Sequence, residues 1–479
     1  MSLKKRLTAV GILAIVAGLT IGIAKSGKEI TPANFPEKGT SLFSGGRETI
    51  YIWYTDETLS SYISGAAVAY NETHDIRVVP VLESGLEYLE HINQASLEDN
   101  APDMYVLGHN SLEKAYLAGL ASEIKPGEDI SLEELYMQTG LSAVTYKDKL
   151  IGYPFYFETS SLLYNKTYLE DMARNQLTVE KDMAAAQEAE QELAENGPQE
   201  EVQGEEQTED ITEEQIAQRI EEILPTNLEE MKNFADSYDA SEQGEAVFKW
   251  DVTDIFYNYF FIGDTIQMGG EAGYDVSQID IYNKNAIDSM KAYAELNQFF
   301  SIDTSEIEYD SVIDEFVSGK LVFTVATTDV VTRLEQAKED GLFAYEYGIA
   351  LTPDIDAERK TRSLSVTSCV VINGYSEHPE EANDFARFLT SEYNDILYAR
   401  TGKVSSALHV DYGYEALNEF AKEYEKSISM PKMLETSNFW IQLEATFAEV
   451  WNGADAEQKL KELSEQMLQQ VSGRKKEEE

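Results

Sequence analysis

The segment from Lys149 to Lys166 constrains the fold more than any other part of the chain. It is almost entirely apolar, aromatic or hydroxylated, and it contains one acidic residue, Glu158. Pro154 lacks the backbone donor that a strand interior requires, so the residues before it are typical of a strand that enters a turn. The apolar run after Glu158 ends at Asn165, which is typical of a turn or helix cap. The pattern predicts two short extended segments that flank one carboxylate, with Glu158 at a crossing between them.

Chain length and charge limit the class of protein. A chain of 479 residues with 43% apolar residues exceeds what one hydrophobic core usually supports, so two or more folding units are expected. The 88 acidic and 37 basic side chains give a formal net charge of −51. Such a charge repels phosphate backbones, which argues against nucleic-acid binding and is typical of a very soluble surface.

The N-terminus has the pattern of an export segment. Lys4, Lys5 and Arg6 precede an uncharged run from Leu7 to Ile23. Residues 1–25 are therefore predicted to be a signal peptide or an uncleaved N-terminal membrane anchor, and the Gly, Pro and Ser content of residues 26–47 predicts a flexible tether. No cysteine follows this run for lipid attachment, and Cys369 is the single cysteine of the chain, so an intrachain disulfide is excluded.

The first folded residues predict an α/β architecture. Residues 48–54 have a strand pattern, residues 60–71 a helical pattern and residues 75–81 a second strand pattern. A strand, helix and strand with short connections form a βαβ unit, which implies a parallel sheet. Ligands of such sheets lie beyond the carboxyl ends of the strands. Tyr54, Asp56 and Glu57 are at the end of the first strand, and Asn110 follows a later strand at residues 103–108.

Residues 176–223 differ sharply in composition from the rest. Between Glu180 and Glu222 there are 16 acidic residues, and large apolar residues are sparse until Ile211, Ile216, Ile220 and Ile223. We predict an acidic insertion made of a helical arm, a disordered middle and a second amphipathic helix. Two interpretations remain open: a solvated excursion without function, or a helical hairpin that contacts a partner.

Several motifs, in the same order along the chain, resemble the family 1 extracellular solute-binding proteins, which include the maltose/maltodextrin-binding proteins. The Glu158 segment resembles the hinge of that family between two lobes. Further similar elements are Asp103–Asn110, Gly119–Ile124, Phe316–Val325, Met430-Pro431 and Ser437–Trp440. The set extends over about residues 48 to 472.

The resemblance implies a two-lobed periplasmic-binding-protein type II fold, in which each lobe is a mainly parallel sheet flanked by helices and crossing segments form the hinge. The expected N-terminal lobe is 48–157 plus 368–424, and the expected C-terminal lobe is 158–367 plus 425–472. The insertion at 176–223 then belongs to the C-terminal lobe, and 473–479 is a charged tail.

Catalytic signals are scarce. The chain has no Gly-x-Ser-x-Gly elbow and no His-Glu-x-x-His motif. The five histidines (His74, His91, His109, His378 and His409) are scattered without metal-ligand spacing. No enzymatic activity, metal or cofactor is therefore predicted, and we interpret His109 as a polar residue at a strand end.

The remaining candidates are those of a binding site. Sugars present flat apolar ring faces and a rim of hydroxyls, so aromatic side chains together with carboxylates and amides are typical of their sites. The resemblance assigns sugar contacts to Glu158, to Trp440 and to either Asp56 or Glu57. The full set of predicted ligand-binding residues is Tyr54, Asp56, Glu57, Asn110, Tyr156, Glu158, Tyr257, Asp329 and Trp440, with Phe157 as a further candidate ring.

Other positions depart from the family. A tryptophan, an aspartate and an arginine of the family fall on Leu107, Asn110 and Ser111, and a second aromatic platform falls on Asp329. A tyrosine and an arginine after the family's Phe-Trp pair fall on Ile441 and Glu444. These differences argue for a sugar other than maltodextrin, or for another polar solute.

The leading hypothesis is a substrate-capture protein of an ABC importer. It would bind a small molecule, with a carbohydrate as the expected class, outside the cytoplasm by closing two lobes around a hinge, and deliver it to permease subunits as a monomer. The alternative is a membrane-anchored ligand sensor or scaffold that contacts a membrane partner through the acidic insertion.

Overall fold

The computed structural model describes residues 47–98, 100–127, 130–196, 211–238, 246–300, 302–304 and 307–478. The predicted N-terminal segment (1–25), nearly all of the tether (26–47) and the middle of the insertion (197–210) lie outside these residues. Residues 48–479 form one compact unit.

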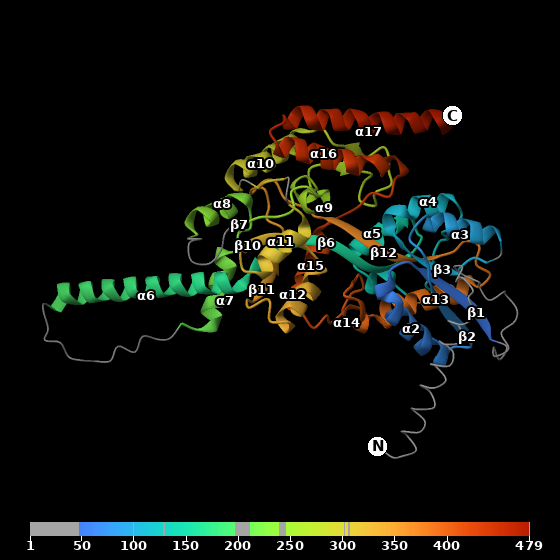
Figure 1. The fold of residues 1–479 in the computed structure, drawn as a ribbon, viewed down its shortest axis with the longest axis horizontal. Coiled ribbons are helices and arrows are strands. Elements are labelled where there is room, and N and C mark those ends of the chain that lie inside the picture. The colour runs from blue at the N-terminus through green and yellow to red at the C-terminus, as the bar shows by residue number, and fades with distance from the viewer. Residues whose placement is uncertain are drawn as a thin grey trace, which may run out of the picture. The chain divides into compact units, whose positions relative to one another are not determined.

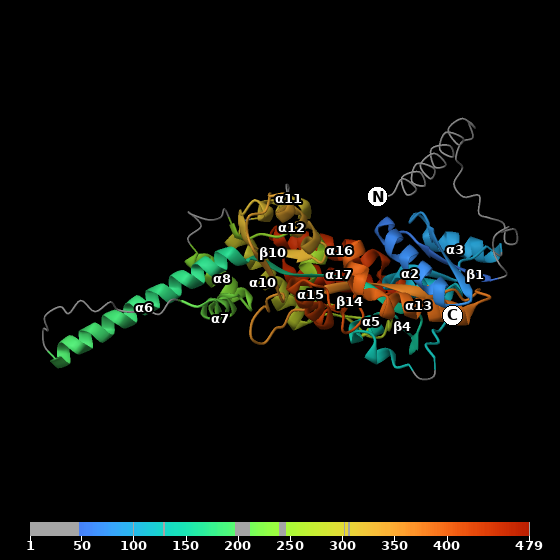
Figure 2. The same cartoon turned by 90° about the horizontal axis from the view of Figure 1, so that it is seen from below.

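The chain folds into an α/β structure (Figures 1 and 2). The strands are β1 (Glu48–Tyr54), β2 (Ile76–Leu82), β3 (Met104–Gly108), β4 (Thr145–Tyr146), β5 (Lys149–Leu150), β6 (Tyr153–Asn165), β7 (Ala246–Phe248), β8 (Gln267–Met268), β9 (Ile279–Asp280), β10 (Leu321–Thr327), β11 (Tyr347–Ala350), β12 (Leu364–Ile372), β13 (Val404–Ser405) and β14 (Ile428–Ser429). The α-helices are α2 (Ser60–Thr73), α3 (Tyr88–Leu97), α4 (Leu112–Leu117), α5 (Gln138–Ala143), α6 (Lys166–Asn196), α7 (Glu213–Ile223), α8 (Leu228–Ser237), α9 (Ile255–Asn258), α10 (Lys284–Phe300), α11 (Tyr309–Val317), α12 (Val330–Glu339), α13 (Pro379–Arg387), α14 (Leu397–Thr401), α15 (Glu415–Lys426), α16 (Phe439–Trp451) and α17 (Ala456–Glu478).

The principal sheet has ten strands in the order β2-β1-β3-β12-β6-β10-β7, with β11 and β13 also paired to β6 and β14 paired to β12. The predicted parallel arrangement is present where β1 pairs with β2 and β3, and again where β10 pairs with β7. Each antiparallel pairing of this sheet involves β6 or β12. Those two strands are therefore the ones that connect its regions.

Strand β6 is one continuous strand rather than two segments around a turn. Its first half, through Thr159, pairs with β12, and its second half, from Ser160, pairs with β10 and β11. The predicted turn at Pro154 is wrong because the register with β12 shifts there, which leaves Phe155 as an extra residue between the pairs made by Pro154 and Tyr156. A bulge accommodates the missing proline donor within a strand. Glu158 does lie at the crossing, as predicted.

The hydrophobic side chains form separate cores on the two sides of that crossing. One core takes Tyr156 and the preceding residues of β6 together with β1, β2 and β3. Another begins at Phe157 and includes the second half of β6 with β10, α10, α16 and α17. Leu417, Phe420 and Tyr424 of α15 belong to the second core. Phe157, a candidate ring, is fully buried and stacks on Tyr424 with ring centroids 3.9 Å apart, so it is a core residue.

The acidic insertion is helical in its described part. Helix α7 begins with a capping box between Thr212 and Gln215, and its apolar residues Ile216 and Ile220 are buried in the second core. Arg219 pairs with Glu180 of α6 at 2.7 Å. The two predicted helices are thus confirmed, and α7 contributes to the core rather than being solvated all round.

A buried lysine after β14, Lys432, connects three segments of the chain. Lys432 is 1% exposed, and its ammonium group donates to the carbonyl oxygens of Thr145 (3.0 Å), Ser142 (3.4 Å) and Ala272. These acceptors lie in the α5–β4 turn and in the loop between β8 and β9. Burial, which disfavours the charged form, lowers the pKa of Lys432 to about 7.

This lowered pKa predicts a pH-dependent stability. Between pH 7 and 8.5 the unfolded chain binds a proton at residue 432 that the folded chain releases, so stability rises with pH. We expect the unfolding free energy of the wild type, relative to that of Lys432→Met, to increase by about 1–2 kcal/mol from pH 7 to pH 8.5. Denaturant unfolding at both pH values measures it, with Lys284→Met as the control because Lys284 is 89% exposed. A constant difference across this interval would contradict the assignment.

Candidate ligand-binding site

The site begins with the exposure pattern of β6. Glu158 is exposed, while the four residues on each side of it along the strand are buried. The surrounding protein still removes water from its carboxylate, and this desolvation raises its pKa. Repulsion by the charges of Asp329 and Asp56 acts in the same direction, whereas the positive charge of Lys403 opposes it. Glu158 is therefore a solvent-accessible carboxylate whose charge is influenced by Lys403, Asp329 and Asp56.

Lys403 is the cation of this group, and sequence analysis missed it. It follows Gly402, whose positive φ of 70° ends helix α14, and it precedes β13, which pairs with β6. Its ammonium group lies 3.1 Å from Asp56 Oδ2 and 5.4 Å from the ring centroid of Tyr156. Burial lowers the pKa of Lys403, but its neighbours Tyr156, Asp56 and Glu158 raise it overall.

Asp56 is positioned by a local cap. It precedes a short 3-10 helix, Glu57–Leu59, and accepts hydrogen bonds from the Thr58 backbone (2.9 Å) and hydroxyl (2.7 Å). Burial raises the pKa of Asp56, but these bonds and the contact with Lys403 outweigh it and lower the pKa. The structure therefore distinguishes the two candidate acids, because Asp56 joins the Lys403 group and Glu57 is exposed beside it.

A second group lies after β10. The rings of Tyr257 and Tyr309 stack at 4.7 Å with an interplanar angle of 13°. The Tyr309 hydroxyl donates to Asp329 Oδ1 (3.4 Å), and Thr327 donates to the same carboxylate oxygen. Desolvation raises the pKa of Tyr257, and the neighbouring Tyr309 adds to the effect. Tyr309 and Thr327 were missed in the sequence because their contacts depend on a strand and a helix folding together.

Three other candidates lie in different surroundings. Tyr54 is 4% exposed and packs in the first core, since it is the last inward-facing residue of β1. Trp440 is half-buried against Tyr259, with ring centroids 5.8 Å apart. Asn110 is exposed, with its amide nitrogen 3.6 Å from the sulfur of Met430. The ligand contact predicted for Tyr54 is not supported by this burial, whereas those of Asn110 and Trp440 stay predictions.

His109 has a structural role. It is fully buried, its Nε2 lies 2.8 Å from the Met430 carbonyl oxygen, and its Nδ1 accepts from the Thr367 backbone at 2.9 Å. Burial, together with the charge of Lys432, lowers its pKa to about 3. A histidine that stays neutral and ties β3 to β12 is a strand-end polar residue, as the sequence predicts.

A groove opens at the carboxyl ends of β1, β2 and β3, where the parallel sheet predicts a ligand site. Its volume is about 600 Å³. Leu107 and Ser111, which stand where the resembling family has tryptophan and arginine, line it together with Lys114. The complete lining is Thr55, Gly85, Glu87, Tyr88, Leu89, Glu90, Leu107, Ser111 and Lys114.

Strand β6 passes between two hydrophobic cores and carries an exposed carboxylate at the passage, and a groove opens at adjoining strand ends. Clefts beside such strand ends are typical of proteins that bind small solutes. The chain belongs to the family described as "Bacterial extracellular solute-binding protein", whose model matches residues 65–411. Members of this family act outside the cytoplasm. Among the described residues, we find no helix with the length and apolar character that a membrane span requires.

Known proteins with similar sequence or structure are also binding proteins. The galactooligosaccharide-binding protein of Bacillus subtilis (strain 168) is 21% identical over 488 residues, which cover 97% of each chain. A cyclo/maltodextrin-binding protein in complex with maltotetraose superposes with a TM-score of 0.68 at 19% identity, covering 90% of this chain and 98% of that one. An extracellular solute-binding protein from Staphylococcus aureus in complex with maltose gives 0.69 at 19% identity, with 89% and 98% covered. These structural matches confirm the predicted fold, and the matches together favour solute capture over the sensor or scaffold alternative.

The positive charge of Lys403 near Glu158 leads to a prediction about the pKa of Glu158. In Lys403→Met, we expect the pKa of Glu158 to rise further than in the wild type, because the one charge that opposes the rise is removed. Carboxyl carbon NMR of Glu-labelled protein measures the titration. Lys422→Met is the matched control, since Lys422 is 62% exposed and pairs with Glu419. An unchanged Glu158 titration in Lys403→Met would show that the two groups do not interact.

Proposed function

We propose that this protein captures a carbohydrate, most simply an oligosaccharide, and delivers it to the permease of an ABC importer. The ligand would lie around Glu158, between a lobe that contains the first core, with β1, β2 and β3, and a lobe that contains the second core, with β10, α10, α16 and α17. The single observation that carries the proposal is the exposure of Glu158 within an otherwise buried strand, together with a cation and two further carboxylates that influence its charge.

The chemistry of this group suits a ligand rich in hydroxyls. Carboxylates accept hydrogen bonds from sugar hydroxyls, and an ammonium group donates to their oxygens. Asp56, Glu158 and Asp329 supply the acceptors, and Lys403 supplies the donor. Tyr156 is 9% exposed, and its ring lies under the Lys403 ammonium group at 5.4 Å, so it supports this donor. Such a set binds a neutral polyol by many individually weak, directional bonds.

The residues that line the groove indicate which class of sugar is bound. A galactooligosaccharide-binding relative and maltose-binding neighbours suggest oligosaccharides as the class. Because Leu107 and Ser111 line the groove in place of tryptophan and arginine, we propose an oligosaccharide other than a maltodextrin. We further propose that the protein acts as a monomer, that it releases the sugar chemically unchanged, and that residues 1–25 either anchor it or are removed on export.

Substitution of Glu158 tests the proposal directly. We expect Glu158→Gln to bind its sugar about tenfold to a hundredfold more weakly, because a charged acceptor is lost. The same variant should melt at a higher temperature at pH 7. The raised pKa of Glu158 means that folding disfavours its charged form, and glutamine removes that charge.

Isothermal titration against a panel of galacto-oligosaccharides, maltodextrins and unrelated oligosaccharides identifies the ligand and measures the loss. Glu170→Gln is the control, since Glu170 lies on α6 and pairs with Lys166, which is not a candidate residue. Failure of the wild type to bind any sugar of the panel would count against a carbohydrate ligand. Full affinity in Glu158→Gln would exclude the proposed site.

A further inference from the structure

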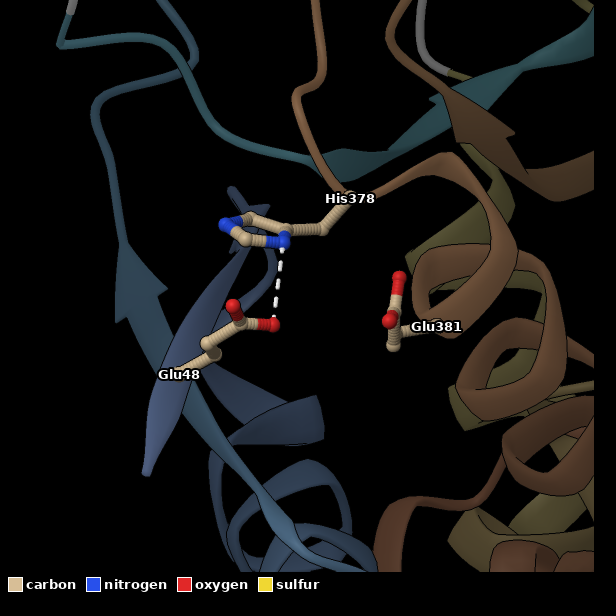
Figure 3. Close-up of side chains that lie close together, drawn as sticks. All are labelled: Glu48, His378 and Glu381. Carbon is tan, nitrogen blue, oxygen red and sulfur yellow. Dashed lines mark ion pairs between the residues drawn. The ribbon is translucent and has the colours of Figure 1, made fainter. Parts of the chain in front are cut away.

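A second cluster of ligating side chains lies outside the Glu158 site. Glu48 is the first residue of β1, and His378 and Glu381 belong to the beginning of α13. Figure 3 shows the three side chains facing a common space, with His378 Nδ1 3.6 Å from Glu48 Oε2. One ligand atom from each residue lies within 4.8 Å of the other two. Among the described residues, this is the one group of three or more His, Cys, Asp or Glu side chains whose ligand atoms all lie within 4.8 Å of one another.

The main chain that carries these residues is held in place by Asp103, which is buried. One carboxylate oxygen of Asp103 accepts from the Tyr51 backbone in β1 (2.8 Å), and the other accepts from the Ser376 hydroxyl (2.7 Å). The Ser376 hydroxyl oxygen in turn accepts from the His378 backbone at 3.0 Å. The strand with Glu48 and the turn with His378 are therefore fixed relative to each other by groups that are not themselves part of the cluster.

We propose that Glu48, His378 and Glu381 bind a divalent transition-metal ion such as zinc. One imidazole nitrogen and two carboxylate oxygens are donors that Zn²⁺ accepts, and three protein ligands leave a fourth position for water. An imidazole in the set argues against Ca²⁺ and Mg²⁺, which prefer oxygen ligands. The side chains are exposed or half-buried, so they can move by the fraction of an ångström that coordination requires.

The electrostatic balance of the position also favours a cation. The beginning of a helix carries partial positive charge, which opposes a metal ion at α13. The two carboxylates of the cluster offset this, and so does the chain's formal net charge of −51. A bound ion would join the start of β1 to α13, which packs against β12 at the same region of the sheet. It would thereby stabilise the folded chain by its binding free energy.

The chain offers matched controls. His91 and Glu83 form another histidine–carboxylate pair at 3.4 Å, which is outside the cluster and lacks its third ligand. Glu380 is an exposed acid in the same turn of α13 as Glu381. Substitution of these residues changes the same charges without changing the proposed site.

Isothermal titration of the full chain with ZnCl₂ tests the proposal. We expect one site in the wild type, and at least a tenfold loss of affinity in Glu48→Gln, His378→Ala and Glu381→Gln. Glu380→Gln and His91→Ala should bind zinc like the wild type. Zinc should also raise the melting temperature of the wild type and of the two controls, while the three site variants melt at the wild-type temperature without zinc and show no rise with it.

Two results would overturn the proposal: equal zinc affinity in the site variants and the wild type, or displacement of zinc by Ca²⁺ at equal concentration. Either would assign binding to diffuse attraction by the acidic surface. Absorption of the Co²⁺-loaded protein provides an independent readout, because nitrogen and oxygen ligands in a four-coordinate site give intense visible bands that His378→Ala should lose. None of these measurements depends on a sugar ligand, so the outcome is separate from that of the proposed function.

Discussion

The pairing of β6 with different partners along its length is the constraint on which the rest of the structure depends. Its first half pairs with β12 and β13 and its second half with β10 and β11, so one strand borders two hydrophobic cores. A strand buried on both faces has little room for charge, and Glu158 is the single charged residue of β6. A carboxylate in such a strand is tolerated only where it reaches water. Glu158 is that residue, and its position at the crossing links the fold directly to the site.

The charges around Glu158 reflect a compromise between stability and binding. Burial raises the pKa of Glu158, and the charges of Asp329 and Asp56 add to the rise. Lys403 reduces the electrostatic cost of these carboxylates, since it pairs with Asp56 and attracts Glu158 at the same time. Sites that retain such strained electrostatics often do so for function, because a ligand can replace the lost hydration with directed hydrogen bonds. The same acidic surplus over the whole chain makes a cation between Glu48 and Glu381 electrostatically reasonable.

Local patterns predicted much of the fold. The bounds of β1 agree with the strand predicted at residues 48–54, because alternation and β-branched content are local properties of a strand. Pro154 was misassigned because a bulge depends on the partner strand, which the local sequence does not contain. Tyr54 was assigned to the site from its place at a strand end, yet it faces the core. The apolar residues of α7 indicated an amphipathic helix, but their burial depends on the core that this helix covers.

The sequence by itself determined the α/β class, the crossing at Glu158, the acidic insertion and the membership in a solute-binding family, because each follows from composition, periodicity or a collinear set of motifs. Only the tertiary structure decided which side chains meet. Lys403 reaches Asp56, Tyr309 reaches Asp329, and His378 reaches Glu48, although each pair is separated in the chain. Nothing in the local sequence of either partner encodes such a contact. It arises because strand pairing brings distant segments together, and a few ångströms then determine whether two charges interact.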